Sequence, residues 1–397
     1  MAVASDGQRV AVFLPVGKQT FMEDVWTMEL TTPAPANVWD DAIRTARARF
    51  THIDPERLAA FISAQSDVHG PVSIEDFDTL TDGSGMSNGI AFFTAVIDRG
   101  EGPQRESLVL RYAPGVSLLQ QKSFEDEFLT MQAVHAAGLT VPAVMWLDAD
   151  GEGIGAPGFV MERVVGEIPA SAMYSRGPFA KLSNEDRHRM MLEPAGFHGR
   201  LRKAAIGADR VPHLLKRGEG ATPLERELSW WLKEAQLITE PDDPRFLRVK
   251  SVHDWLLANQ PPVREATLIH GDAQHCNTIF RNGVPAGVLD WELAHLGYAE
   301  TDIVMMVLTT EILKLTDIVV DDTPTEEEYI ARYEAESGEK VEHWAYFKLC
   351  MAYRYLVGQI FAANALPNPE EMWAIVDKIV TENLAEAKAA SASSQQA

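Results

Sequence analysis

Residues 268–292, LIHGDAQHCNTIFRNGVPAGVLDWE, constrain the fold of this chain more than any other stretch. A His, two Asp, an Asn and a Glu alternate there with apolar residues, among them Leu268, Ile269 and Leu289. The apolar residues indicate a segment that passes through a core. Because polar groups beside a core cost free energy unless they have partners, we predict that this stretch carries chemistry and is not a surface loop.

A tight turn at Asn282 and Gly283 predicts a β-hairpin within this stretch. Short β-like runs at residues 278–281 and 286–289 flank the turn. A hairpin brings the outer ends of its two strands together. The side chains just outside the two runs are therefore expected to share one site.

Asn277 stands directly before the first run and Asp290 directly after the second. An amide oxygen and a carboxylate that converge in this way suit Mg²⁺, which binds oxygen ligands and completes its shell with phosphate and water. Asp272 lies on the loop that leads into the hairpin, where its carboxylate can act as a base. The pattern predicts a magnesium site with a base beside it.

The same stretch fits the pattern H-G-D-x-x-x-x-N, which is met by His270, Gly271, Asp272 and Asn277. A second motif, D-W-E, begins at Asp290. With these two motifs the sequence resembles the aminoglycoside phosphotransferase family, which shares the protein-kinase-like fold. The resemblance implies an α+β chain of two lobes: a small β-rich N-lobe with one main helix, and a larger helical C-lobe.

The resemblance also implies a role for each polar residue of the two motifs. Asp272 would be the catalytic base, and Asn277 and Asp290 would hold Mg²⁺. The phosphoryl donor would be ATP or GTP, and the acceptor would be a hydroxyl group of a small molecule. His270 would be structural and would bond the backbone near the catalytic loop.

The nucleotide-binding elements of that family are expected upstream of the two motifs. The resemblance assigns nucleotide contacts to the glycine-rich turn, at Gly83, Ser84, Gly85, Met86, Ser87 and Asn88. Glycines at such a turn let backbone N–H groups approach phosphate closely. Arg111 stands on the third predicted strand, where the family usually has Lys, and it should pair with Glu127 in the following helix, Glu125 being the alternate position.

Residues 159–163, FVMER, match the connector between the lobes in that family. The resemblance implies that the connector backbone bonds the adenine edge, with Val160, Met161 and Arg163 at the nucleotide site. The side chains also fit an ordinary core strand.

The acceptor site is expected in the helical part, with candidate substrate contacts at Glu292, His275, Tyr353 and Arg354. The acidic run at 321–344 could hold ammonium groups, as in the aminoglycoside enzymes, although a charge run usually forms a solvated face. Aromatic residues in the helix predicted at 341–363 fit a bulky apolar or anionic acceptor better. The segments VLRYAPG and LDWELAHLG further resemble a branch of the family. That branch includes phosphotransferase domains that are fused to acyl-CoA dehydrogenases and act on hydroxyacyl-CoA.

Two other classes of function fit part of the pattern. A metal-dependent hydrolase could use His270, Asp272 and His275 as its metal ligands, although the sequence has no second histidine cluster of suitable spacing. A catalytically silent nucleotide-binding module could keep the fold without the reaction. The intact set of Asp272, Asn277 and Asp290 favours an active enzyme.

The chain is predicted to divide into a lead-in at residues 1–50, an N-lobe at 51–162, a C-lobe at 163–390 and a disordered tail at 391–397. In the N-lobe we expect strands at 72–80, 90–98 and 107–113, helices at 55–65 and 123–137, and two strands around a glycine-rich loop within 141–164. In the C-lobe we expect helices at 183–205, 222–238, 251–259, 298–314, 325–336, 341–363 and 369–389.

The net charge and the number of cysteines indicate which binding partners and which cellular compartment to expect. A net charge of −23 argues against nucleic acid and anionic membranes as partners. The two cysteines, Cys276 and Cys350, make a disulfide framework improbable and favour the reducing cytoplasm. No apolar run is long enough to span a membrane, and the N-terminus does not resemble a secretory signal. The oligomeric state is left open by the sequence.

Overall fold

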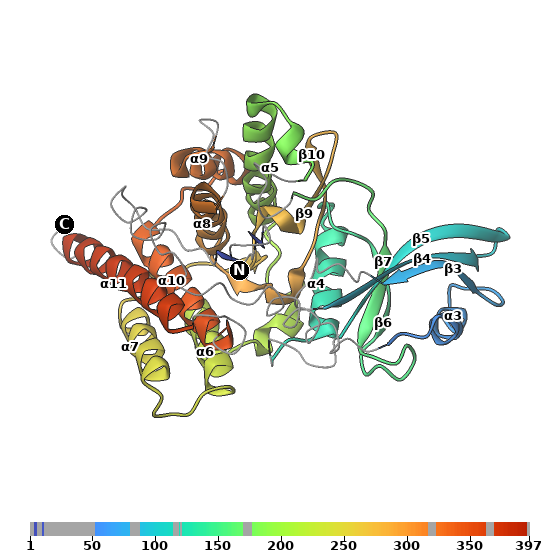
Figure 1. The fold of residues 1–397 in the computed structure, drawn as a ribbon, viewed down its shortest axis with the longest axis horizontal. Helices are drawn as coiled ribbons and strands as arrows, with labels where there is room; N and C mark the ends of the chain where they lie inside the picture. Colours follow the sequence, from blue (N-terminus) through green and yellow to red (C-terminus); the bar gives the residue numbers. More distant parts are fainter. Residues whose placement is uncertain are drawn as a thin grey trace. The chain divides into compact units, whose positions relative to one another are not determined.

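The structure is a computed structural model that describes residues 52–79, 88–113, 119, 121–169, 177–316, 323–362 and 369–394, and two short strands, β1 (Ala4–Ser5) and β2 (Val10–Ala11). Contacts between residues separate an N-terminal unit, which ends at Val165, from a C-terminal unit, which continues from Gly166 (Figure 1). Apart from β1 and β2, the predicted lead-in lies outside the described residues.

The N-terminal unit contains one antiparallel sheet of five strands in the order β3-β4-β5-β7-β6. These strands are β3 (Ser73–Thr79), β4 (Gly89–Asp98), β5 (Pro103–Tyr112), β6 (Val144–Asp148) and β7 (Gly158–Glu162). All five strands were predicted, but β5 begins at Pro103, before the expected start at 107. Its first residues are polar and exposed, so they lack an apolar pattern although they pair with β4.

Helix α3 (Pro55–Ser63) begins where the helix was predicted, and the Asp54 carboxylate caps it by accepting a hydrogen bond from Glu56 N at 2.9 Å. Its buried side chains, Leu58 and Ile62, join the core formed by the sheet. Helix α4 (Phe124–Ala136) packs on the sheet through Phe124 and Phe128. Both rings meet the edge of Phe159 on β7, with centroids 6.2 and 5.8 Å away.

The C-terminal unit is mostly helical, with α5 (Asn184–Lys203), α6 (Pro223–Gln236), α7 (Pro244–Ala258), α8 (Glu300–Thr316), α9 (Glu326–Ser337), α10 (Trp344–Ala362) and α11 (Pro369–Ser394). All seven helices were predicted. Helix α7 begins earlier than expected because Asp243 caps it and Pro244 occupies its first position. Within the described residues, no helix is long and apolar enough to cross a membrane.

Two short antiparallel ladders lie among these helices. Strand β8 (Thr267–Ile269) pairs with β11 (His295–Gly297), and β9 (Thr278–Arg281) pairs with β10 (Val284–Val288). The β9–β10 pair is the predicted hairpin, and Asn282 and Gly283 in its turn both have positive φ, at 54° and 77°. The hairpin therefore forms because its turn residues tolerate the left-handed conformation.

The prediction of a disordered tail at 391–397 is wrong for its first part, because α11 continues to Ser394. The preceding residues, 385–390, have the sequence AEAKAA and are rich in alanine, which has the highest helix propensity. Ser393 Oγ also donates to Ala389 O, one helical turn earlier, at 3.0 Å. Residues 395–397 lie outside the described residues.

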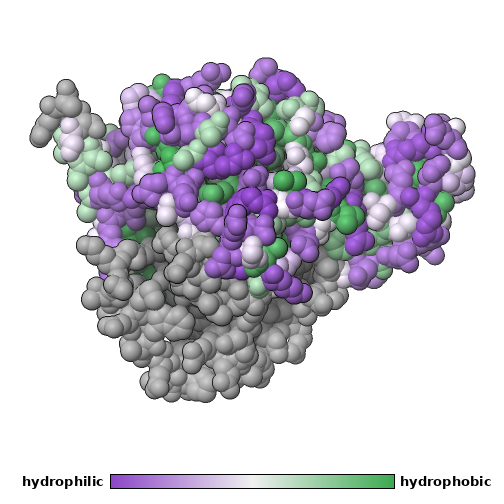
Figure 2. All heavy atoms as spheres, turned by 90° about the horizontal axis from the view of Figure 1, so that it is seen from above, coloured by the Kyte–Doolittle hydropathy of each residue, from purple (hydrophilic) through white to green (hydrophobic). Residues whose placement is uncertain are grey.

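The surface seen in Figure 2 carries mainly hydrophilic residues, with hydrophobic ones scattered between them. The three most exposed of the large apolar side chains, Val165, Val263 and Val284, lie far apart in the sequence. Single exposed apolar residues of this kind are normal for a globular protein.

Candidate active site

The loop of residues 270–277, here called the HGD loop, follows β8 and ends in the short helix η3 (His275–Asn277). Asp302, in the first turn of α8, holds the start of the loop. One carboxylate oxygen of Asp302 accepts from His270 N at 2.9 Å, and the other accepts from Gly271 N at 2.8 Å. The loop is thus fixed to α8 by two backbone hydrogen bonds.

Asp302 also lies 2.9 Å from Nδ1 of His198 on α5. Burial would raise the pKa of the Asp302 carboxyl, but His198 and the hydrogen bonds at the HGD loop hold it well below its usual range. The carboxylate therefore stays charged, as its three contacts require.

Gly271 is required at the second position of the motif. Its φ is +81°, and a Cβ atom added there would lie 2.2 Å from Leu293 O. Its carbonyl accepts a hydrogen bond from Arg354 Nη2. Both the conformation and the close approach exclude a side chain immediately before Asp272.

The Asp272 carboxylate is held from two sides within the HGD loop. Asn277 Nδ2 donates to Asp272 O at 2.9 Å and to Asp272 Oδ2 at 3.0 Å. Gln274 Nε2 donates to Asp272 Oδ1 at 2.8 Å, and Asp272 N donates to His270 Nδ1 at 3.2 Å. Asp272 remains half-buried, so its carboxylate is oriented without being sealed in the core.

The backbone brings Asp290 next to Asn277. Leu289 N donates to Asn277 O at 2.8 Å, and His270 Nε2 lies 2.8 Å from Leu289 O. Asp290 itself has φ 68° and ψ 56°, a left-handed conformation that is uncommon for a residue other than glycine. Such strain is often found at functional sites.

The Cys276 thiol in the HGD loop is held in its protonated form. Burial raises the pKa of its thiol to about 12, and the negative charges of Asp272 and Asp290 act in the same direction. The thiol is therefore protonated and unsuited to be a nucleophile. That Asp272, Asn277 and Asp290 converge around one ion remains a prediction.

The donor set at this place fits a magnesium ion. Because Nδ2 of Asn277 is used on Asp272, the amide turns Oδ1 away from that carboxylate. An amide oxygen together with the Asp290 carboxylate gives the hard oxygen ligands that Mg²⁺ prefers. The nitrogen and sulfur ligands typical of transition metals are not part of this set.

The alternative metal site of a hydrolase does not form. Both ring nitrogens of His270 are engaged, with Asp272 N and Leu289 O. His275 Nε2 lies 3.0 Å from Met191 O and 2.9 Å from Tyr329 OH. In the part of the chain that the structure describes, no group of three His, Cys, Asp or Glu side chains could hold a metal ion.

His275 gives a testable pH dependence of stability. Burial lowers the pKa of His275 from 6.5 to about 4. Between these values the unfolded chain binds a proton that the folded chain does not. The contribution of His275 to stability therefore falls as pH drops from about 6.5 to about 4, and His275 adds no pH dependence outside that window. The shift corresponds to about 3 kcal/mol.

The comparison is urea unfolding of the wild type and of His275→Gln at pH 7.5 and pH 4.5. The wild type is expected to lose more stability than the variant over this interval, because glutamine does not titrate. Other buried histidines titrate in both proteins and cancel in the difference. An equal loss in the two proteins would show that His275 is not buried in its neutral form.

The predicted acceptor residues lie in different environments. Glu292 is half-buried in the short helix η4 (Trp291–Leu293), and its carbonyl accepts from Arg217 Nη1 at 3.0 Å. Tyr353 is fully buried and its hydroxyl donates to Leu228 O at 3.1 Å. Tyr353 and the buried His275 thus have structural surroundings, and neither is retained in the acceptor proposal.

The predicted pair of Arg111 and Glu127 is present in the N-terminal unit. Arg111 on β5 is 9% exposed, Glu127 on α4 is 3% exposed, and Arg111 Nε lies 3.0 Å from the Glu127 carboxylate. Asn88 is buried at the start of β4, where its Oδ1 accepts from Lys122 Nζ at 2.6 Å. The other predicted residues of the glycine-rich turn lie outside the described residues: Gly83, Ser84, Gly85, Met86 and Ser87.

The predicted connector forms strand β7 and the residues after it. Val160 and Met161 are buried, and both pair with β5 and β6. The Arg163 guanidinium lies over the Phe92 ring, 4.5 Å from its centroid. The side chains of Val160 and Met161 are therefore part of the core of the sheet, whereas Arg163 is exposed, and the role of the connector with adenine remains a prediction.

Two residues that hold the site were not anticipated. Gln274 holds Asp272, and Arg217, on the segment that follows the short helix η2 (Pro212–Lys216), donates to Glu292 O and Ala294 O. Gln274 lies inside the motif, where the variable positions could have suggested a second donor to the carboxylate. Arg217 carries no local signal, because its partners lie far along the chain.

A sequence model of the phosphotransferase enzyme family matches residues 92–348, which is more than half of the chain. Among solved structures, a candidate aminoglycoside phosphotransferase from Ralstonia eutropha is similar, with 20% identity and a TM-score of 0.62 over 85% of this chain and 99% of that one. The choline kinase LicA from Streptococcus pneumoniae is similar at 14% identity and a TM-score of 0.50, over 82% of this chain and 98% of that one. These likenesses confirm the predicted protein-kinase-like α+β fold.

Two mouse proteins are similar in sequence. Acyl-CoA dehydrogenase family member 10 from Mus musculus is 26% identical over 291 residues, which are 70% of this chain and 25% of that protein. Acyl-CoA dehydrogenase family member 11, also from Mus musculus, is 28% identical over 202 residues, 50% of this chain and 24% of that protein. The chain thus spans about a quarter of the length of these relatives.

Proposed function

Because the chain belongs to the phosphotransferase enzyme family and is a small-molecule kinase, we propose that it moves the γ-phosphoryl group of ATP to a hydroxyl group of its acceptor. The observation that carries this proposal is the Asn277 amide, which bonds both the backbone and the carboxylate of Asp272. The same residue is joined through its carbonyl to the segment that carries Asp290. One side chain thus links the proposed base to the proposed metal ligands.

Asp272 acts as the base in the proposed reaction. The acceptor hydroxyl gives its proton to the Asp272 carboxylate while its oxygen forms a bond with the γ-phosphorus. The bond from that phosphorus to the oxygen bridging the β- and γ-phosphates breaks, and ADP leaves with the electron pair. Gln274 and Asn277 orient the carboxylate for this transfer.

Asn277 and Asp290 are the residues proposed to hold Mg²⁺. The ion would supply charge neutralisation at the phosphates, which carries much of the catalysis in phosphoryl transfer. Nucleotide use is supported by the similar fold of LicA, which has been solved in complex with AMP and has a TM-score of 0.52 to this chain. ATP is the proposed donor. GTP is the alternative donor, and a comparison of the binding of ATP and GTP distinguishes the two.

Arg111 is proposed to anchor the nucleotide phosphates, with Glu127 as its partner. The guanidinium fork can contact a carboxylate and a phosphate at the same time, although the family usually has Lys at this position. The pair is buried, so the loss of one member would leave the other as an uncompensated charge. A stability effect and a binding effect must therefore be separated.

A pair of variants makes this separation. Arg111→Met alone is expected to destabilise the fold by about 3–5 kcal/mol, because Glu127 keeps its charge in the core. Arg111→Met combined with Glu127→Leu is expected to regain most of that stability, since both charges are gone. Nucleotide affinity, measured by calorimetry with Mg-ATP, is expected to stay at least tenfold weaker in both. Wild-type affinity in the folded double variant would contradict the anchoring role.

Two acceptor classes have support. The similarity to two proteins named for acyl-CoA dehydrogenases supports a hydroxyacyl-CoA acceptor. The candidate aminoglycoside phosphotransferase among the structural relatives, together with the net charge of −23, supports a cationic sugar. We favour the hydroxyacyl-CoA or another bulky metabolite, because the sequence similarity to the mouse proteins is closer than that to the solved structures.

The test is ADP formation with Mg-ATP and a panel of hydroxylated compounds that includes hydroxyacyl-CoAs of several chain lengths, aminoglycosides and choline. Acceptor-dependent ADP formation, with a matching phosphorylated product by mass spectrometry, is the expected result. Mg-ATP binding without any ADP formation would favour the silent nucleotide-binding module, and the absence of Mg-ATP binding would contradict the kinase proposal. Product formation only from an aminoglycoside would overturn the preferred acceptor class and leave the kinase proposal intact.

A further inference from the structure

Resting on the proposed role of Asp272, we propose that Arg354 is a positioning residue, which sets the HGD loop from helix α10 while the buried carboxylate of Glu227 balances its charge. Arg354 was predicted to contact the acceptor, but its guanidinium is turned inward, and the residue is only 6% exposed. Its Nη2 atom donates to Gly271 O, the carbonyl directly before Asp272. The guanidinium carbon lies 4.8 Å from the centroid of the Trp231 ring, which supports it from α6.

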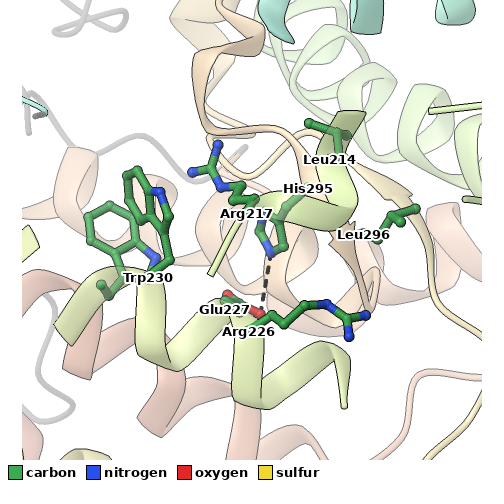
Figure 3. A pocket seen from close by; sticks show the side chains of 8 residues that line it. Leu214, Arg217, Arg226, Glu227, Trp230, His295 and Leu296 are labelled. Atoms are coloured by element: carbon green, nitrogen blue, oxygen red, sulfur yellow. Dashed lines mark ion pairs between the residues drawn. The ribbon is translucent and has the colours of Figure 1, made fainter. Parts of the chain in front are cut away.

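Glu227 on α6 carries the negative charge that we assign to Arg354 as its countercharge. It lines a small pocket together with Trp230, Trp231 and Arg217, and Figure 3 shows its carboxylate directed at His295. His295 Nε2 lies 3.4 Å from Glu227 Oε2. Both carboxylate oxygens are inaccessible to solvent and have no hydrogen-bond donor within bonding geometry. They are therefore not reachable by an acceptor.

The charge of Glu227 is instead balanced within the protein. Burial would raise the pKa of Glu227, but His295 and then Arg354 lower it, so that the carboxylate remains ionised. Nε and Nη1 of Arg354 are also buried without a hydrogen-bond partner. A guanidinium does not lose its proton, so a buried one needs a countercharge nearby. Glu227 fills that need without a direct hydrogen bond.

The same cluster contacts both segments of the proposed site. His295 is paired with Ile269, the last residue of β8, and β8 leads into the HGD loop. Its Nδ1 lies 2.9 Å from Leu293 O, the carbonyl that also excludes a side chain at Gly271. Glu227, His295 and Arg354 thus connect α6 and α10 to the loop before Asp272 and to the segment after Asp290.

This arrangement predicts a specific kinetic effect. Without the Arg354 guanidinium, the Gly271 carbonyl loses its donor and the peptide before Asp272 can rotate. A misplaced base affects the chemical step and leaves nucleotide contacts unchanged. Arg354→Met is therefore expected to lower kcat by about 10²-fold, with the KM for ATP within about threefold of the wild type.

A double variant separates positioning from general stability. Arg354→Met should destabilise the fold because Glu227 keeps its charge, whereas Arg354→Met with Glu227→Gln removes both charges and should regain most of the lost Tm. We expect kcat of the double variant to stay low, because Gly271 O still lacks its donor. Recovery of kcat together with Tm would show that Arg354 acts on stability alone and would overturn the proposal.

Arg226→Met is the matched control. This arginine lines the same pocket, but its guanidinium faces Gly220 O and Ala221 O and makes no contact with the HGD loop. The kcat and KM of Arg226→Met are expected to equal those of the wild type. A similar fall in kcat in Arg226→Met would assign the effect to the pocket as a whole and contradict a specific role of Arg354.

Amide hydrogen exchange, followed by mass spectrometry on the full chain, tests the inference without an acceptor. Peptides that cover residues 270–277 should exchange at least tenfold faster in Arg354→Met than in the wild type, and at the wild-type rate in Arg226→Met. Unchanged exchange in all variants would overturn the positioning role. If the wild type shows no acceptor-dependent turnover but the loop exchange responds as expected, then the proposed function fails and the structural inference stands.

Discussion

Replacing Asp272 with asparagine is expected to lower kcat by about 10²–10⁴-fold, the usual contribution of a general base. The amide has nearly the same shape as the carboxylate, and its single oxygen can still accept the hydrogen bond of either Asn277 Nδ2 or Gln274 Nε2, which bond different oxygens of Asp272. It cannot take the proton of the acceptor hydroxyl. Initial rates of ADP formation with the best acceptor of the panel measure the effect.

The binding of Mg-ATP to Asp272→Asn provides the control for this prediction. Calorimetry is expected to give a Kd within about threefold of the wild type, because Asp272 is neither a proposed metal ligand nor a phosphate anchor. Gln274→Ala is a milder variant, in which the carboxylate stays but loses one donor. A kcat of Asp272→Asn within tenfold of the wild type would refute the assignment of Asp272 as the base.

Replacing Asp302 with alanine is expected to lower the free energy of unfolding by about 3–5 kcal/mol, the range found when one partner of a buried ion pair is removed. His198 would lose its partner, and the backbone N–H groups of His270 and Gly271 would be buried without an acceptor. The HGD loop would lose its attachment to α8. Urea unfolding at pH 7 measures the loss, and turnover is expected to fall with it.

Asp302→Asn is the matched comparison, because it keeps the size of the side chain and one acceptor oxygen. The free energy of unfolding of Asp302→Asn should lie between the values of the wild type and of the alanine variant. The pKa of Asp302 is far below its ordinary value of 3.8, so its contribution is fully present above about pH 4 and disappears only in strong acid. A loss below about 1 kcal/mol in the alanine variant would show that the loop is held by other contacts.

The sequence predicted the parts of the site that depend on local structure. Asn282 and Gly283 fix the hairpin, and a hairpin necessarily brings Asn277 close to the residue that follows its second strand. The pairing of Arg111 with Glu127 was predicted from the family resemblance and is present in the structure. The hairpin inference needed only neighbouring residues, whereas the ion pair needed the family pattern.

Contacts between elements distant in sequence could not be predicted. Arg354 and Tyr353 are adjacent on α10, where an aromatic helix with one cation suggested an acceptor pocket. The structure buries both, because Tyr353 bonds α6 and Arg354 reaches the HGD loop. The helical pattern fixes which residues share a face, but it does not say whether that face meets a ligand or the core.

Two helix boundaries were predicted wrongly for local reasons. The start of α7 was placed too late, although Phe246 and Val249 continue its apolar spacing and Asp243 caps its first turn. The low-complexity end of α11 was taken for disorder because it lacks apolar residues. Alanine propensity and the packing of the preceding turns extend the helix to Ser394.

The measurement that tests the central claim most directly is a crystal structure of the full chain with Mg²⁺ and a non-hydrolysable ATP analogue. The account predicts a magnesium ion coordinated by Asn277 Oδ1 and the Asp290 carboxylate, with phosphate oxygens completing its shell. Asp272 should remain bonded to Asn277 and should not coordinate the ion. A metal held by the ring nitrogens of His270 or His275, or a nucleotide bound away from Asp290, would contradict it.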